Sequence, residues 1–385
     1  MKKETVLPAA STDQSSTGEA TASPLPGATH RRSFLKGLGV AGAAVSASAV
    51  LGGQAKAQFF NRELTPGDVA ILRFLAAAEL IESDLWEQYA ELGGLTPGQL
   101  PVETAPFTPM NSYQAAFMNL DSDGPQYISS NTLDEMSHAS FLNKYLQSKG
   151  ARPVNLDKFR KLPSSTVAPQ QTGRLTNLTQ LTVDTSWYTR YRSSKNPDFG
   201  ATFPQAVVLK DVTAIPETSG DFANSDRIQV IANTAAFHFG FIEQGGTSLY
   251  AGMAQKAHSL EVLRIVLSIG GDEIAHFLEW VDFSGNGVQP GVAPVTDPET
   301  GLTFPNFDAT VDPSLQTNLI FPVPCEFISP KLPLCAVIRP TDPKGVAAGA
   351  VKALTDDGLF IGQPNEFFDT LAVLAEEADR AERGF

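Results

Sequence analysis

The sequence is poor in cysteine and has far fewer basic than acidic residues. Its two cysteines, Cys325 and Cys335, are too few for a disulfide scaffold and cannot form a four-thiolate metal site. The 28 basic residues against 42 acidic ones give a net charge of −14, which disfavours nucleic-acid binding because phosphate backbones repel such a surface. The sequence also has no Gly-rich phosphate loop and no Gly-x-Ser-x-Gly nucleophile motif. What remains is 42% hydrophobic, close to the average of soluble globular proteins, so a folded core is expected.

The N-terminal region has the pattern of an export signal. Residues 1–29 are polar and of low complexity, and Arg31 and Arg32 precede a short run rich in glycine and alanine at 37–51. Residues 55–57 read Ala-Lys-Ala, a small-x-small cleavage pattern, so we predict a twin-arginine signal over residues 1–57 and a periplasmic or secreted mature protein. The apolar run is shorter than the roughly 20 residues of a membrane span, and no later stretch is apolar enough to be one. In an oxidising compartment Cys325 and Cys335 could pair, but their spacing does not decide this.

Four long helices are predicted in the first two thirds of the mature chain. The first begins with the capping residue Thr65 and with Pro66 at the first helical position, and it ends at Gly93-Gly94. Ser259 is the predicted cap of the fourth. The predicted helices span residues 66–92, 124–149, 226–257 and 259–283.

The connections between these helices predict how they are arranged. A crossover of roughly 75 residues separates the second helix from the third, whereas the third and fourth are joined almost directly. We therefore predict an all-α core at 58–283, an antiparallel four-helix bundle with a long crossover between helices two and three. Residues 284–345 are rich in proline and glycine and predict an irregular or short-strand appendage. Residues 346–385 predict two C-terminal helices, at 346–356 and 365–382.

One motif occurs twice, on the second and the fourth helix. Residues 134–138 and 272–276 both read Asp-Glu-x-x-His, and the spacing i, i+3 puts each Glu and His on one helix face. Two Glu-x-x-His matches among the four histidines beyond residue 57 would arise by chance in roughly 1–2% of such sequences. The other two helices also resemble each other, since each has a glutamate followed by an aromatic residue two turns later: Glu79 with Trp86, and Glu243 with Tyr250.

These residues predict a metal site. A carboxylate in the middle of an apolar helix must be exposed, paired or bound to a cation, because burying it alone costs several kcal/mol. Four glutamates and two histidines that face one interior would repel one another strongly, and two divalent cations would remove that repulsion.

The complete pattern resembles the ferritin-like superfamily of di-iron and di-manganese carboxylate proteins. Within it, the chain is similar to exported ferritin-like domain proteins related to the desiccation-related proteins of plants. The resemblance covers the four predicted helices and none of the connections. It implies two Fe or two Mn ions, with Glu135 and Glu273 as bridging ligands and the other glutamates as terminal ligands. The implied ligands are Glu79, Glu135, His138, Glu243, Glu273 and His276.

The chain departs from the superfamily pattern at some positions and leaves alternatives open at others. Trp86 stands where superfamily enzymes often have tyrosine, so a phenol contact to the opposite glutamate is lost there. Trp86 and Tyr250 are both expected next to the ligands. Glu82 could be the helix-one ligand in place of Glu79, although Glu79 better mirrors Glu243. Two consecutive glycines, at 245 and 246, would allow either a close backbone approach or a local bulge.

The sequence also predicts the outer partners of the metal-binding histidines. A metal-bound imidazole usually donates its second N–H to a carboxylate. We expect Asp134 to serve His276 and Asp272 to serve His138, each across the bundle. The remaining helical histidine, His238, lies between two phenylalanines and is interpreted as a structural residue with satisfied hydrogen bonds.

The resemblance implies redox chemistry on dioxygen, hydrogen peroxide or ferrous iron, so the expected partner is a small-molecule oxidant or a metal ion. Ferroxidase, peroxidase and manganese-catalase activities all fit this ligand set, in connection with oxidative or desiccation stress. The alternative is a metal-containing stress protein of the cell envelope that performs no catalysis. Whether the chain is an enzyme is left open by the sequence, which is also compatible with a homo-oligomer.

Overall fold

The computed structural model describes residues 64–95, 111–192, 203–310, 312, 315, 322–323, 328–337 and 343–383. The predicted signal at 1–57 and Cys325 lie outside these residues. The described chain is mostly helical, as predicted, with two small two-stranded sheets.

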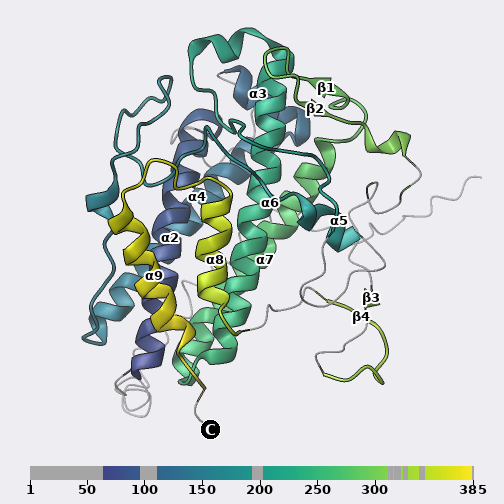
Figure 1. Ribbon diagram of the computed structural model, residues 1–385. Coiled ribbons are helices and arrows are strands. Elements are labelled where there is room, and N and C mark those ends of the chain that lie inside the picture. Colours follow the sequence, from purple (N-terminus) through teal and green to yellow (C-terminus); the bar gives the residue numbers. More distant parts are fainter. Residues whose placement is uncertain are drawn as a thin grey trace, which may run out of the picture. The chain divides into compact units, whose positions relative to one another are not determined.

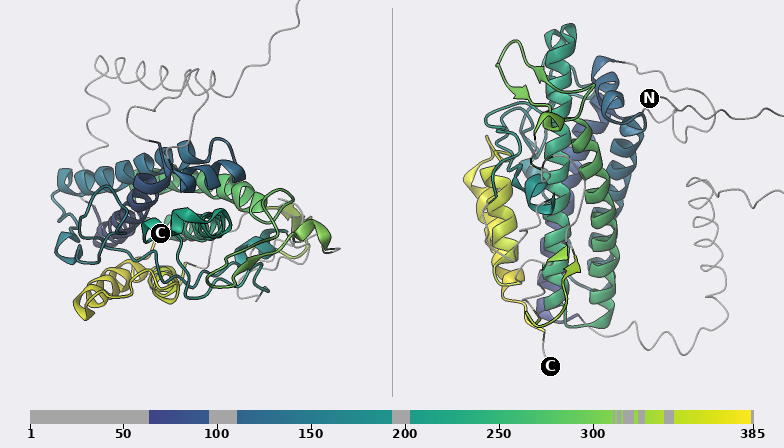
Figure 2. Two further views of the ribbon diagram at one scale, coloured as in Figure 1. Left: turned by 90° about the horizontal axis from the view of Figure 1, so that it is seen from above. Right: turned by 90° about the vertical axis from the view of Figure 1, so that its right-hand side faces the viewer.

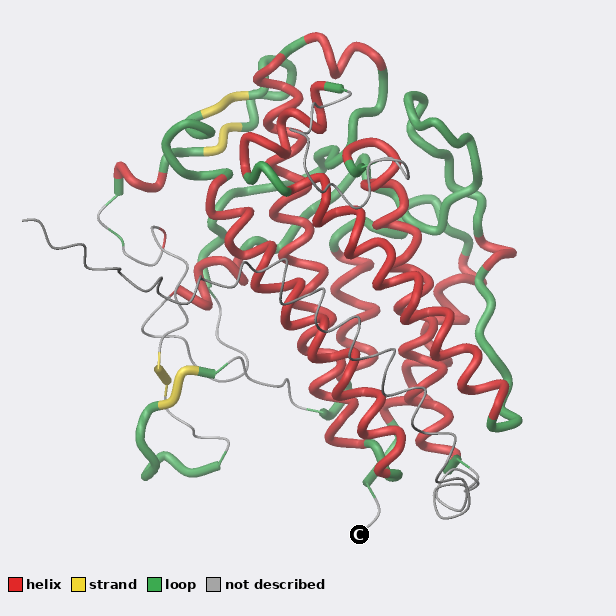
Figure 3. Tube along the Cα trace, turned by 180° about the vertical axis from the view of Figure 1, so that it is seen from behind, coloured by secondary structure: helices red, strands yellow, loops and turns green. Residues whose placement is uncertain are grey.

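Four long helices lie alongside one another in Figure 1, and Figure 3 shows them from behind. Helix α2 packs against α4 and α6 packs against α7, while α4 also contacts α7. Each helix begins within one residue of its predicted start and ends within three residues of its predicted end. Their bounds are α2 Pro66–Gly93, α4 Gly124–Ser148, α6 Ser225–Lys256 and α7 Leu260–Asn286.

Side-chain caps determine where these helices begin. The Thr65 hydroxyl accepts a hydrogen bond of 3.0 Å from the backbone N–H of Asp68, at the start of α2. The Ser259 hydroxyl accepts one of 3.2 Å from the backbone N–H of Val262, at the start of α7. Such caps satisfy donors that have no partner inside the helix, so the first turn forms where they occur.

Four shorter helices complete the helical part. Helices α8 (Val346–Asp356) and α9 (Asn365–Asp379) correspond to the two predicted C-terminal helices. The sequence reading did not predict α3 (Ser112–Leu120) or α5 (Ser186–Arg192), which lie within the connections between the long helices. Single-turn 3₁₀ helices are η2 Asp157–Phe159, η3 Ser219–Ala223 and η4 Phe307–Ala309.

The C-terminal helices cover one side of the long helices. Helix α9 packs against α2, and α8 packs against both α6 and α9. Seen from above in Figure 2, α8 and α9, drawn in yellow, lie on one side, and α4 and α7 lie on the side away from them. The long helices are therefore enclosed more fully on the α2 and α6 side.

Between α7 and α8 the described chain is irregular and has short strands. Strands β1 (Val295–Thr296) and β2 (Thr303–Phe304) pair antiparallel, and β1 contacts α6. Strands β3 (Pro322–Val323) and β4 (Cys335–Ala336) form a second antiparallel pair.

The core between the helices is largely aromatic and aliphatic. Trp86 stacks on Trp280 with ring centres 5.4 Å apart, and Phe239 packs against both indoles. Burial of such rings supplies much of the free energy that holds the helices together. Among the described residues, every helix is either too short or too polar to serve as a membrane span.

Candidate metal centre

Six predicted ligand residues meet between the four long helices. Glu79 projects from α2 and Glu243 from α6, while α4 and α7 each contribute the Glu and His of one motif. Three glutamates, Glu79, Glu135 and Glu273, have no exposed surface. The other three residues are at most 8% exposed, so the whole group lies in the interior.

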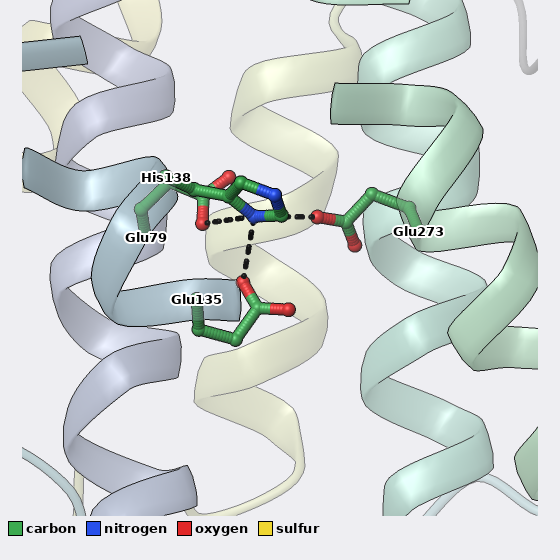
Figure 4. A group of neighbouring side chains, drawn as sticks. All are labelled: Glu79, Glu135, His138 and Glu273. Atoms are coloured by element: carbon green, nitrogen blue, oxygen red, sulfur yellow. Dashed lines mark hydrogen bonds and ion pairs between the residues drawn. The ribbon is translucent and has the colours of Figure 1, made fainter. Parts of the chain in front are cut away.

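One half of the group is centred on His138 (Figure 4). Its Nδ1 atom lies 3.4 Å from Oε2 of Glu79, 3.4 Å from Oε2 of Glu135 and 3.8 Å from Oε1 of Glu273. One ligand atom from each of these four residues lies within 4.8 Å of the others. Bonds from divalent ions to nitrogen or oxygen are about 2.0–2.2 Å long, so ligand atoms on opposite sides of one ion are about 4 Å apart. The four side chains therefore fit around a single cation.

The other half of the group is centred on His276. Its Nδ1 atom lies 3.2 Å from Oε1 of Glu135 and 3.4 Å from Oε2 of Glu243. Glu135 thus directs one carboxylate oxygen towards each histidine. Glu135 therefore connects the two halves of the group.

An aspartate from the facing helix lies outside each histidine. The Nε2 atom of His138, on α4, is 3.2 Å from Oδ2 of Asp272, on α7. The Nε2 atom of His276, on α7, is 3.5 Å from Oδ2 of Asp134, on α4. These are the crossed pairs that the sequence leads us to expect. Because Nε2 faces an aspartate in both rings, Nδ1 is the nitrogen left to face the cluster.

Several buried oxygens of the cluster make no hydrogen bond within the described part of the chain. They are Oε2 of Glu79, Oε1 of Glu135 and both carboxylate oxygens of Glu243 and of Glu273. A buried polar atom without a partner costs about 1–3 kcal/mol, and more when it is charged. Six such oxygens around two histidines are the donor set that a divalent cation would satisfy.

Charge and burial perturb the protonation of the cluster strongly. Burial, together with the negative charge of Glu135, raises the pKa of Glu79 to about 8. Burial also raises the pKa of Glu243 and Glu273. For Glu135 burial acts in the same direction, but its close contacts with His138 and His276 outweigh it and lower the pKa to about 2.

The histidines are shifted in the opposite direction by their acidic neighbours. Burial alone would lower the pKa of His138, yet close contacts with the carboxylates of Asp272, Glu135 and Glu79 raise it to about 12. Burial would likewise lower the pKa of His276, but the charge of Glu243 and close contacts with the carboxylates of Asp134 and Glu135 raise it. Without metal, both rings are therefore protonated, and the proton on Nδ1 of each ring lies where a metal ion would bind.

Tyr250 and Trp86 make the two halves of the cluster unequal. The Tyr250 hydroxyl, from α6, donates a hydrogen bond to Oε1 of Glu79, which leaves Oε2 of Glu79 facing His138. Trp86, at the mirrored position of α2, has a buried Nε1 without a hydrogen-bond partner among the described residues. Within the described segments, Glu243 accordingly receives no hydrogen bond from an aromatic side chain, in line with the loss expected at residue 86.

Glu82 does not join either half of the cluster. It is 7% exposed and belongs to none of the ligand groups found among the described residues. Burial first, and then the charges of Glu79, Glu135 and Glu243, raise its pKa well above the ordinary value. Its side chain lines a neighbouring cavity instead, so the geometry favours Glu79 as the ligand from α2.

The structure shows what each glycine of the pair on α6 allows. A Cβ atom at Gly246 would lie 2.0 Å from Oε2 of Glu273, whereas at Gly245 nothing lies within 4 Å. Only glycine lets the carboxylate approach the α6 backbone this closely. Gly246 is therefore a close-approach position, and the helix continues through both glycines without interruption.

His238 has a structural environment, as interpreted from the sequence. Its Nδ1 lies 2.7 Å from the Tyr89 hydroxyl, and its Nε2 lies 3.0 Å from Oδ2 of Asp357, at the end of α8. Asp357 is 119 residues from His238, and no local pattern in the sequence links them. Asn131 and Trp280 are likewise far apart in the sequence, and no local pattern links them. The side-chain oxygen of Asn131 accepts a hydrogen bond of 2.8 Å from Nε1 of Trp280.

Comparisons of the chain with protein-family models, with curated proteins and with solved structures found no match.

Proposed function

We propose that this chain is an exported ferritin-like protein that binds two iron or two manganese ions and uses them in redox chemistry. In this proposal α2, α4, α6 and α7 form the four-helix bundle of that superfamily. The observation that carries it is the position of Glu135, whose two carboxylate oxygens face two separate histidines. The buried oxygens without hydrogen bonds support it, because cations would satisfy them.

Each ligand has a role that follows from its position. Glu135 would hold metal in both halves of the cluster. The resemblance assigns the same role to Glu273, whose Oε1 lies in the His138 half. Glu79 would bind through Oε2 alone, because Tyr250 holds its other oxygen. Glu243 would be the terminal ligand of the His276 half.

The chain's own residues would hold the centre in place and keep it away from bulk water. Asp272 contacts Nε2 of His138, and Asp134 contacts Nε2 of His276. These contacts would fix the orientation of the two rings. The six side chains lie in the interior, and none of them is more than 8% exposed. Bound there, the metal pair would supply electron transfer with dioxygen, hydrogen peroxide or ferrous iron. Carboxylate-rich ligation suits iron and manganese equally.

The test is metal analysis combined with turnover. We expect about two Fe or Mn ions per chain and consumption of dioxygen or hydrogen peroxide. Glu135→Gln should abolish both, while Glu376→Gln, a surface change on α9, should leave both unchanged. Bound zinc alone would overturn the redox proposal. Bound iron or manganese without turnover would favour the second candidate, a stress or desiccation protein of the cell envelope without catalytic activity.

Export is a separate part of the proposal. It rests on the paired arginines and the Ala-Lys-Ala sequence at 55–57. Cell fractionation should find the protein outside the cytoplasm with a new N-terminus at Gln58, and changing Arg31 and Arg32 to lysine should retain the uncleaved chain inside.

A further inference from the structure

A cavity lies beside the carboxylate cluster, enclosed by α2, α6, α8 and α9. Its volume is about 90 Å³. Glu82 and Gln244 are the polar side chains among the described residues that line it. The other side chains of its wall are apolar and include those of Phe74, Ile81, Phe241, Leu249, Leu354 and Leu371.

The cavity shares a wall with the cluster. Gly246 lines the cavity, and its missing Cβ faces Oε2 of Glu273, so at this point only the backbone of α6 separates the two. Glu82 reaches the same cavity from α2, one turn after the ligand Glu79. A molecule in the cavity would thus lie next to two carboxyl groups that belong to, or neighbour, the metal site.

The cavity also has a route to solvent. Gly245 on α6 and Ala353 on α8 both line it, and both residues are exposed. A Cβ atom at Gly245 would begin in open space, with nothing within 4 Å. The cavity therefore reaches the surface between α6 and α8.

The lining determines which molecules the cavity can accept. A buried water needs two to four polar partners, and apolar cavities of about 150 Å³ stay dry and bind xenon or benzene. An ion or a strongly hydrated molecule would lose its hydration on entering and find few partners. The lining and the size therefore select a small, uncharged, apolar molecule and disfavour ferrous iron.

We propose that this cavity is a binding site for a small uncharged apolar molecule, held beside Glu82 and the carboxylate of Glu273. The binding site stands on the cavity itself, whereas its connection to a reaction rests on the function proposed above. Helices α8 and α9 form one wall of the site, which gives the C-terminal region a role in selecting the ligand.

Xenon is a suitable probe because it is apolar and of the right size. The experiment is ¹²⁹Xe NMR on the full chain, with and without added metal, and metal content is measured on the same samples. Gly245→Leu and Ala350→Leu each place a larger side chain in the cavity from opposite walls. Gly349→Leu is the matched control, because Gly349 is exposed on α8, does not line the cavity and has nothing within 4 Å of a Cβ.

We expect saturable xenon binding in the parent chain and in the control, and binding at least about tenfold weaker in both filling variants. The proposal is overturned if the parent chain shows no saturable binding, or if both filling variants, shown to be folded by thermal unfolding, bind xenon as the parent does. If the chain binds xenon in the expected pattern but holds no metal, the proposal of the cavity site stands and the proposed function is wrong.

Discussion

The Nε2 atom of His138 lies 3.2 Å from Oδ2 of Asp272, a residue of the facing helix α7. Hydrogen bonding to His138 lowers the pKa of Asp272, so this carboxylate stays charged where it meets the ring. A charged partner on Nε2 directs Nδ1 to the cluster and makes it a stronger ligand.

Replacing this aspartate should weaken metal binding without removing a ligand. In Asp272→Asn the partner of His138 loses its charge, and the metal affinity should fall about 10–100-fold. Competition with a chelator of known affinity measures the change. Asp282→Asn, an exposed change on the same helix, is the control and should have no effect. An unchanged affinity in Asp272→Asn would show that the aspartate does not act through His138.

The two glutamates of α2 should respond differently to the same substitution. Glu79→Gln replaces the carboxyl group whose Oε2 lies 3.4 Å from Nδ1 of His138 with an amide, a weaker ligand, and should reduce the bound metal by at least one ion per chain. Glu82→Gln should leave the metal content unchanged, because that side chain lines the cavity. Elemental analysis of the two purified variants decides between them, and the opposite result would make Glu82 the ligand.

The two adjacent glycines of α6 offer a matched pair of variants. Gly246→Ala puts a Cβ 2.0 Å from Oε2 of Glu273, so it should displace that carboxylate, lower the metal content and cost about 1–3 kcal/mol of unfolding free energy. Gly245→Ala meets open space and should stabilise the helix by roughly 0.5–1 kcal/mol. Urea unfolding and metal analysis test both. Equal effects at the two positions would mean that the contact with Glu273 does not matter.

Metal binding should release protons, and affinity should rise with pH. Without metal, His138 with a pKa of about 12 and Glu79 with a pKa of about 8 are both protonated at pH 7. The pKa values of His276 and Glu273 are also raised, so filling the site with metal must displace at least about three protons at pH 7. Above pH 8 the number should fall by about one, because Glu79 is then already ionised. Calorimetry in buffers of different protonation enthalpy counts these protons, and a count of zero would contradict the assignment.

His238 should matter for stability and not for metal binding. His238→Phe keeps the ring volume but leaves the Tyr89 hydroxyl and the Asp357 carboxylate without their partner. The expected cost is about 2–4 kcal/mol of unfolding free energy, because both groups are fully buried. Chemical denaturation measures it, and metal content should equal that of the parent chain. Loss of metal in a folded His238→Phe protein would place this residue in the functional site.

The helix positions and the inward face of each motif could be predicted because both depend on neighbouring residues. Thr65 and Ser259 act on backbone groups three residues away, and the Glu-x-x-His spacing sets the angle between two side chains on one helix. The choice between Glu79 and Glu82 could not be made in this way. Both lie on nearly the same side of α2, and what separates them is Tyr250 from α6 beside one and a cavity beside the other.

The sequence by itself determined where the four long helices and the two C-terminal helices lie, which face of each Glu-x-x-His motif points inward, and which aspartates stand next to the two motif histidines. Only the tertiary structure decided that Glu135 faces both histidines, that Gly246 makes room for Glu273, and that α8 and α9 enclose an apolar cavity beside the cluster. The physical reason is the range of the interactions. Caps and helical periodicity act within a few residues, whereas these contacts join side chains far apart in the chain, and their geometry follows from how the helices pack.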